Sequence, residues 1–159
     1  MAGWHPDIVI SPCGGGGLLS GLATAVKGSN PQTHIYGVEP EFYNDHFLSK
    51  NAGRRIRIEP LEKTSCDSLM ATTPGELTWL INKELVDDFL IVTEEDIARA
   101  VSFAARYLKL VVEPGGAAAL AAILARKVSI KNKKVVVILS GGNIDPSALS
   151  GYLRDFSDP

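Results

Sequence analysis

Residues 7–28 read DIVISPCGGGGLLSGLATAVKG and contain a short apolar run, four consecutive glycines and a run of helix-forming residues. The apolar run Asp7–Ser11 is typical of a buried strand. The pattern of Leu18–Lys27 predicts a helix that ends in the turn-forming residues 28–31. A second short run, His34–Val38, predicts the next strand. This order has the length of one βαβ crossover and therefore predicts two parallel strands joined through a glycine loop and a helix.

The rest of the chain continues this alternation. We predict further helices over residues 42–52 and 75–86, after Thr93 and from Pro114, and further strands over residues 88–92 and 133–143. Thr93 and Asp96 have the spacing of a capping box. The helix that they begin is expected to carry one apolar face, made of Ile97, Ala100, Val101, Ala104 and Leu108. Strands alternating with helices predict an α/β fold, a three-layer sandwich with a mainly parallel sheet, in a single domain over residues 1–159.

The composition excludes several classes of protein. The 159 residues are 45% hydrophobic and carry a formal net charge of −2, which suits a packed core and gives no excess of positive charge to attract nucleic acid or an anionic membrane. No apolar segment reaches the ~20 residues of a membrane span. The two cysteines, Cys13 and Cys66, form no CxxC pair. We therefore expect a soluble protein of the reducing cytoplasm.

The four glycines Gly14–Gly17 lie where a ligand site is expected. Ligands of parallel sheets bind beyond the carboxyl ends of the strands, and a glycine loop that opens a helix can direct backbone N–H groups at a phosphate. A P-loop is excluded because Leu22, not lysine, follows Gly21. The dinucleotide pattern GxGxxG lacks its third glycine, although Glu39 stands near the position of a ribose-binding acid. A tight turn without a ligand needs only one or two glycines, so a phosphate site is the favoured interpretation.

Four segments in order resemble one enzyme family. They are SPCGGGGLLSG (11–21), GVEPE followed by an aspartate (37–45), VVEPGGAAALAA (111–122) and VVVILSGGN (135–143). Together they are similar to the fold type II pyridoxal-phosphate enzymes, specifically the threonine/serine dehydratases and serine racemases. The segment CDSLMATTPGELT (66–78) is similar to the threonine dehydratase-like branch. The resemblance covers almost the whole chain and implies pyridoxal 5'-phosphate as the cofactor.

The resemblance also implies roles for individual residues. The backbone N–H groups of Gly14, Gly15, Gly16, Gly17 and Leu18 would bind the cofactor phosphate. The hydroxyl of Ser140 would hydrogen-bond the pyridine nitrogen, and Glu113 would lie near the cofactor ring.

A cation site is implied as well. Glu39 and Asp45, with the backbone carbonyl of Tyr43, match the family's site for Mg²⁺ or Ca²⁺, which take oxygen ligands. From the residues alone, the two acids can equally be solvated side chains of a loop. Family members often have a small residue where Tyr43 stands, but only the carbonyl of this residue would be used.

The family's Schiff-base lysine, in a Ser-x-Lys context, and its small domain have no counterpart in this sequence. We therefore expect the chain to correspond to the C-terminal half of such an enzyme, and we assign no catalytic residue. Because that lysine holds the cofactor and moves the Cα proton, the chain should bind the cofactor phosphate without being competent alone. The alternatives are a stand-alone phosphate-binding protein or, third, a dinucleotide-binding domain. Apolar surface that the other half would cover predicts a homo-oligomer.

Overall fold

The computed structural model describes residues 5–156, in which β1 (Ile8–Pro12) lies inside a four-stranded sheet. The strand order is β3-β2-β1-β4, with β2 at His34–Pro40, β3 at Asp88–Val92 and β4 at Val135–Val137. Every ladder is parallel. All five residues of β1 are buried, which explains why this strand is a continuous apolar run and does not alternate.

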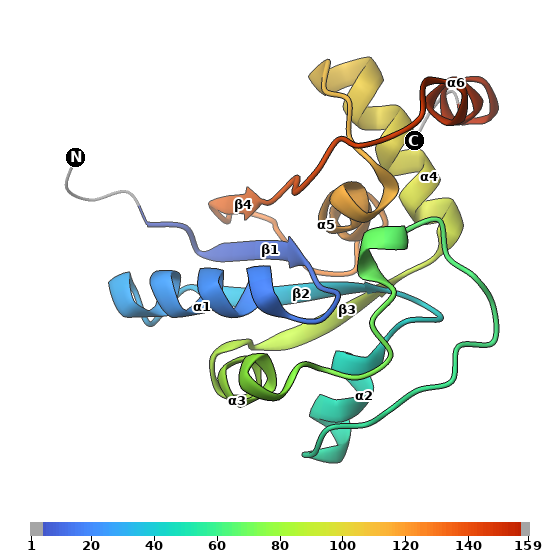
Figure 1. The fold of residues 1–159 in the computed structure, drawn as a ribbon. Helices are drawn as coiled ribbons and strands as arrows, with labels where there is room; N and C mark the ends of the chain where they lie inside the picture. The colour runs from blue at the N-terminus through green and yellow to red at the C-terminus, as the bar shows by residue number, and fades with distance from the viewer. Residues whose placement is uncertain (1–4, 157–159) are drawn as a thin grey trace.

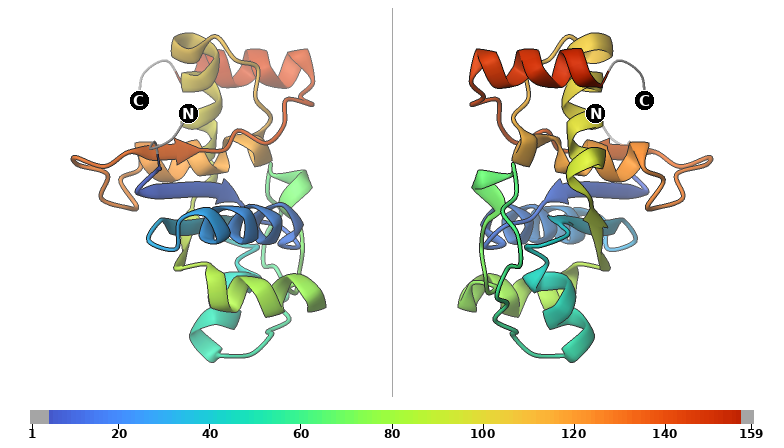
Figure 2. Two further views of the ribbon diagram at one scale, coloured as in Figure 1. Left: turned by 90° about the vertical axis from the view of Figure 1, so that its left-hand side faces the viewer. Right: turned by 90° about the vertical axis from the view of Figure 1, so that its right-hand side faces the viewer.

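Helices cover both faces of the sheet (Figure 1). One face carries α1 (Gly17–Ser29), α2 (Asp45–Ala52) and α3 (Glu76–Leu85). The other carries α5 (Pro114–Leu124), and α4 (Glu94–Phe103) and α6 (Pro146–Asp155) pack outside it (Figure 2). The prediction of a three-layer α/β sandwich is therefore confirmed. Within residues 5–156, no helix combines the length and the apolar character that crossing a membrane requires.

Local sequence signals decide several element boundaries. Thr93 Oγ1 accepts a hydrogen bond from the Asp96 N–H, and Asp96 Oδ2 accepts one from the Thr93 N–H, both at 3.1 Å, so the predicted capping box is present. The apolar helix α5 is buried from Pro114 to Ala122, as its all-round apolar sequence predicts. A 3₁₀ turn at Asp67–Leu69 is a further short element that the sequence pattern did not predict.

Two expectations were wrong, and one helix was not predicted. Leu108 was expected on the buried face of α4, but the helix continues into a π-helical turn, Ala104–Leu108, and Leu108 is exposed. The wider turn changes the angle between successive side chains, so the 3.6-residue period no longer holds. A buried strand that ends in a glycine turn was predicted over 133–143, but the strand is only three residues long and half-buried, because the following segment turns away to pack on the start of α5. Helix α6 was not predicted, although Asp145 caps it by accepting from the Ser147 N–H and Pro146 is its first residue.

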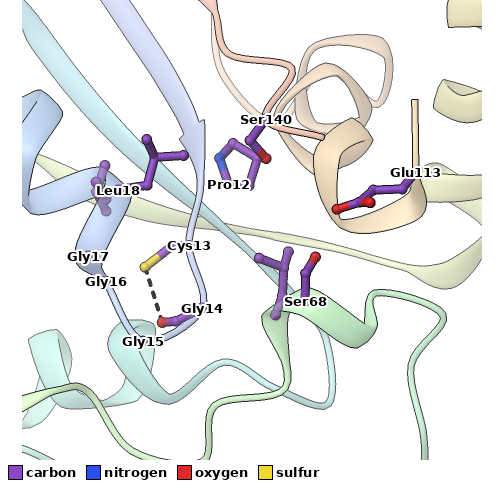
Figure 3. A pocket seen from close by; sticks show the side chains of 12 residues that line it. Pro12, Cys13, Gly14, Gly15, Gly16, Gly17, Leu18, Ser68, Glu113 and Ser140 are labelled. Atoms are coloured by element: carbon purple, nitrogen blue, oxygen red, sulfur yellow. Dashed lines mark hydrogen bonds between the residues drawn. The ribbon is translucent and has the colours of Figure 1, made fainter. Parts of the chain in front are cut away.

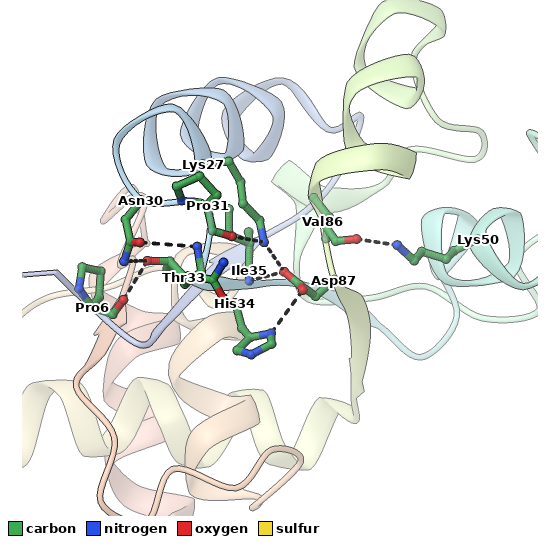
Figure 4. Close-up of polar contacts among 11 residues, drawn as sticks. Pro6, Lys27, Asn30, Pro31, Thr33, His34, Ile35, Lys50, Val86 and Asp87 are labelled. Atoms are coloured by element: carbon green, nitrogen blue, oxygen red, sulfur yellow. Dashed lines mark hydrogen bonds and ion pairs between the residues drawn. The ribbon is translucent and has the colours of Figure 1, made fainter.

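The amino ends of β2 and β3 are tied together by Asp87, at the opposite end of the sheet from the glycine loop (Figure 4). One carboxylate oxygen of Asp87 accepts from the Ile35 N–H at 2.8 Å and lies 3.0 Å from Lys27 Nζ. The other lies 3.1 Å from His34 Nδ1. Partial burial alone would raise the pKa of Asp87, but the Ile35 N–H, Lys27 and His34 together lower it below its usual value.

Candidate functional site

A cavity of about 300 Å³ opens at the carboxyl end of β1 (Figure 3). The residues that line it come from the glycine loop, the 3₁₀ turn, the start of α5 and the segment after β4. They are Pro12, Cys13, Gly14, Gly15, Gly16, Gly17, Leu18, Leu19, Ser68, Leu69, Glu113 and Ser140. The structure thus brings together all six residues that the resemblance assigns to the cofactor, Gly14–Leu18 and Ser140.

The four glycines are not equivalent. Gly16 has φ 89°, a left-handed conformation that favours glycine, and it is the N-cap of α1. A Cβ at Gly16 would also lie 2.7 Å from Asn82 Nδ2 and 2.8 Å from the His46 ring, and both of these side chains are fully buried. At Gly14 a Cβ would lie 3.1 Å from backbone atoms of Ser68 and Leu69. The fold itself therefore requires glycine at Gly16 and favours it at Gly14.

Gly15 and Gly17 are exposed, and a Cβ at either would meet no atom within 4 Å. The packing of the described residues gives no reason for glycine at these two positions. The first hydrogen bond of α1 runs from the Ser20 N–H to the Gly16 carbonyl at 2.9 Å. The N–H groups ahead of it lie at a helix N-terminus with no acidic residue in its first turn. This is an arrangement that favours anions.

Ser140 and Glu113 form the wall opposite the loop (Figure 3). The Glu113 N–H donates to the Gly141 carbonyl at 3.1 Å, and Glu113 Oε2 accepts from the Asn143 N–H at 2.9 Å. A Cβ at Gly116 would lie 2.5 Å from the Gly141 oxygen. The start of α5 therefore holds the segment after β4 at the edge of the cavity, with Ser140 exposed there.

Glu39 and Asp45 form a buried acid pair behind this site. Both residues are fully buried, and the two oxygens of Glu39 accept from the N–H groups of His46 and Phe47 at 2.9 and 2.8 Å. Burial raises the pKa of Glu39 well above its usual value, and the neighbouring Asp45 raises it further. Burial also raises the pKa of Asp45 to about 7. The Asp45 side chain interacts with the Glu39 carboxyl, but within residues 5–156 neither oxygen of Asp45 has a partner in good hydrogen-bond geometry.

This pair bears on two of the sequence hypotheses. Glu39 does not line the cavity, so the single residue that favoured a dinucleotide site is not available to a ribose there.

The two buried carboxyl groups of Glu39 and Asp45 lie side by side, and Asp45 has no partner in good hydrogen-bond geometry among the described residues. Such a pair fits a divalent cation, which would replace the proton that burial favours. Tyr43 is buried at the turn between them, where its N–H donates to the Pro40 carbonyl at 2.9 Å. In the described part of the chain, no group of three His, Cys, Asp or Glu side chains lies close enough together to hold a metal ion. A cation bound by Glu39 and Asp45 would therefore need carbonyl or water oxygens as further ligands.

Ser68 lines the cavity but was not predicted as a site residue (Figure 3). It lies in the 3₁₀ turn Asp67–Leu69, inside the segment 66–78 that resembles threonine dehydratases. A Cβ at Gly115 would collide with Ser68 Oγ, so this glycine lets the turn approach the start of α5. No periodic pattern marks Ser68, because its position depends on this tertiary contact.

Known proteins match both the sequence and the fold. The family described as "Pyridoxal-phosphate dependent enzyme" matches residues 2–141. The catabolic L-threonine dehydratase TdcB of Staphylococcus aureus (strain USA300) is 40% identical over 155 residues, which are 95% of this chain and 44% of the dehydratase. The chain thus spans about half the length of the curated relatives that it matches.

Solved structures agree with this match. A threonine deaminase from T.th. superposes with a TM-score of 0.82 and 43% identity, over 88% of this chain and 47% of that one. Maize serine racemase gives a TM-score of 0.82 and 38% identity, over 93% of this chain and 46% of that one. The chain therefore belongs to the family of pyridoxal-phosphate dependent enzymes, with threonine dehydratases and serine racemases among its relatives.

Proposed function

We propose that this chain forms the phosphate-binding part of a pyridoxal-phosphate-dependent threonine/serine dehydratase. The observation that carries the proposal is the pair Gly15 and Gly17, which are exposed and have open space where a Cβ would stand, on either side of a Gly16 that the fold itself requires. Open backbone N–H groups at the start of α1 suit a phosphate. The dehydratase assignment is supported by the identity to threonine dehydratases.

The proposal gives each wall of the cavity a role. The N–H groups of Gly14–Gly17 and Leu18 would hold the phosphate, and the Ser140 hydroxyl would donate to the pyridine nitrogen. A neutral hydroxyl does not keep that nitrogen protonated as a carboxylate would, so Ser140 would moderate the electron withdrawal. When bound, the cofactor supplies the group that withdraws electrons from the Cα of an amino acid.

We also propose that the chain alone is not a competent dehydratase. The proposal rests on the sequence, in which no lysine near the N-terminus has the family's Ser-x-Lys context. Exposed apolar side chains such as Leu18 and Leu77 support the proposal that copies of the chain associate. A single monomeric species in light scattering at micromolar concentration would contradict that association. The single-domain and cytoplasmic assignments stay predictions.

Titration with the cofactor tests the main proposal. Pyridoxal 5'-phosphate should bind more tightly than pyridoxal, which lacks the phosphate, and inorganic phosphate should compete. Gly17→Ala should weaken the binding of pyridoxal 5'-phosphate and leave the binding of pyridoxal unchanged, because the methyl group of the alanine would stand where the phosphate approaches. Equal affinity for the two compounds in the unaltered chain would refute the phosphate site. Borohydride reduction followed by mass analysis should give no single-site lysine adduct, and a specific adduct would refute the proposed absence of the lysine.

The cation site is proposed on the buried pair Glu39 and Asp45, with the Tyr43 carbonyl. Mg²⁺ or Ca²⁺ at about 100 times its Kd should stabilise the chain by ~2.7 kcal/mol, seen as a rise in melting temperature. Asp45→Asn should abolish this rise, whereas Asp155→Asn, on the exposed end of α6, should keep it. No rise in the unaltered chain with either ion would refute the site.

A further inference from the structure

One polar face of α3 backs the glycine loop. Gly75, Thr78 and Asn82 are spaced by three and four residues and therefore share one side of the helix and its N-cap. Each of them contacts the loop. Thr78 Oγ1 donates to the Gly15 carbonyl at 2.7 Å, the Gly75 N–H donates to the same oxygen at 3.3 Å, and Asn82 Nδ2 donates to the Gly16 carbonyl at 3.4 Å.

The Thr78 contact is specific rather than incidental. Its hydroxyl can also reach the Gly75 carbonyl, but at 3.2 Å against 2.7 Å for the Gly15 carbonyl. Glycine at position 75 makes the approach possible, since a Cβ there would lie 2.7 Å from Thr78 Oγ1 and 3.2 Å from the Gly15 oxygen. The sequence PGELT, residues 74–78, thus acquires a physical role: it brings a hydroxyl and an N–H to one carbonyl of the loop.

Because the peptide bond is planar, the contact to the Gly15 carbonyl also sets the direction of the Gly16 N–H. In a trans peptide unit the carbonyl and the N–H point in opposite directions. When the Gly15 carbonyl is held toward α3, the Gly16 N–H must point away from α3. Helix α3 covers one face of the sheet, whereas Glu113 lines the cavity from the start of α5 on the other face (Figure 1). The fixed carbonyl therefore directs an N–H group to the cavity side of the loop.

The other side chains behind the loop are buried. The His46 ring stacks on Phe89 with centroids 5.1 Å apart, and both His46 and Asn82 are fully buried against Gly16. Thr78 is different, because it holds the exposed Gly15 carbonyl by a single hydroxyl group. This hydroxyl can be removed without opening the core.

We propose that Thr78 is a positioning residue of the phosphate loop: it holds the Gly15–Gly16 peptide with its N–H toward the ligand. The inference deepens the proposed function and rests on it. Loss of the hydroxyl leaves only the longer Gly75 N–H contact, at 3.3 Å, among the two hydrogen bonds from Gly75 and Thr78 to this carbonyl, so the peptide is held less firmly. The affinity for a phosphate ligand should then fall by about 3- to 10-fold, the effect of one hydrogen bond.

Three variants test the proposal. Thr78→Val removes the donor and keeps the shape, and Thr78→Ser restores the donor. The matched control is Thr24→Val, in the middle of α1, where the hydroxyl donates to the Ser20 carbonyl of the same helix at 2.8 Å. In the ligand-free chain, the Gly16 amide should exchange with solvent faster in Thr78→Val than in the other two variants, and its NMR signal should shift.

The same variants are then titrated with pyridoxal 5'-phosphate and with pyridoxal. Thr78→Val should lower the affinity for pyridoxal 5'-phosphate by about 3- to 10-fold and leave the affinity for pyridoxal unchanged. Thr78→Ser and Thr24→Val should bind both compounds as the unaltered chain does. An unchanged Gly16 amide or unchanged affinity in Thr78→Val overturns the proposal. Failure of the unaltered chain to distinguish the two compounds refutes the phosphate site instead, and the amide measurement still decides whether Thr78 orients the peptide.

Discussion

Gly16→Ala is the substitution for which the structure gives the most definite expectation. Alanine at φ 89° costs about 1–2 kcal/mol, because its Cβ crowds the backbone in the left-handed region. The new Cβ would lie 2.7 Å from Asn82 Nδ2 and 2.8 Å from the His46 ring. Neither side chain can swing into solvent, because both are fully buried, so overpacking adds about 1–3 kcal/mol.

One effect opposes these two. Alanine restricts the unfolded chain more than glycine does, which returns about 0.4–1 kcal/mol. The net loss in free energy of unfolding should therefore be about 1–4.6 kcal/mol. The measurement is urea unfolding followed by far-ultraviolet circular dichroism, in which the midpoint should fall by about 0.5–2.3 M for a slope near 2 kcal/mol/M.

Gly17→Ala is the matched control. It places the same methyl group one residue further, at the first position of α1, where no atom lies within 4 Å and φ is not positive. Its stability should be equal or higher, by up to about 1 kcal/mol, because alanine favours a helix. Gly16→Ala should therefore lose stability, whereas Gly17→Ala should lose affinity for phosphate with the fold intact. Equal unfolding midpoints for the two variants would refute the reasoning about Gly16.

Three further predictions concern other parts of the molecule. Asp87→Asn should lower stability by about 1–2 kcal/mol at pH 7. The pKa of Asp87 is lower in the folded chain than in the unfolded chain, so the stability difference between the unaltered chain and Asp87→Asn should shrink as the pH falls below about 4. An equal stability difference at pH 7 and pH 3 in urea unfolding would contradict this prediction. Gly116→Ala should lower the free energy of unfolding by about 2–3 kcal/mol, because its Cβ would lie 2.5 Å from the Gly141 oxygen. Gly21→Ala is the control and should not destabilise the chain, because its Cβ would meet no atom within 4 Å. Similar unfolding midpoints for the two variants would count against the packing argument. Burial raises the pKa of Cys66 to about 12 and that of Cys13 well above its usual value. A disulfide reagent for thiols should therefore react with both cysteines at pH 8 only after the chain unfolds. Fast labelling of the native chain would be inconsistent with the burial of these thiols.

The sequence by itself determined the architecture and the place of the site. Continuous apolar runs such as Ile8–Pro12 are buried on both sides, and their alternation with helices leaves parallel pairing as the consistent arrangement. Four glycines between a strand and a helix placed the candidate site at the carboxyl end of β1, where the cavity lies. Local signals such as the capping box at Thr93 depend on neighbours within a few residues, and these are visible in the chain.

Only the tertiary structure decided what the individual residues of the site do. The sequence does not distinguish Gly16, which is fixed by a left-handed φ and two buried side chains, from Gly15 and Gly17, which are open. Nor does it reveal that Thr78, 63 residues along the chain from Gly15, holds the carbonyl of this glycine. The physical reason is the same in both cases. Burial, close approach and hydrogen bonding between distant segments depend on how the helices pack on the sheet, and local periodicity carries no information about those contacts.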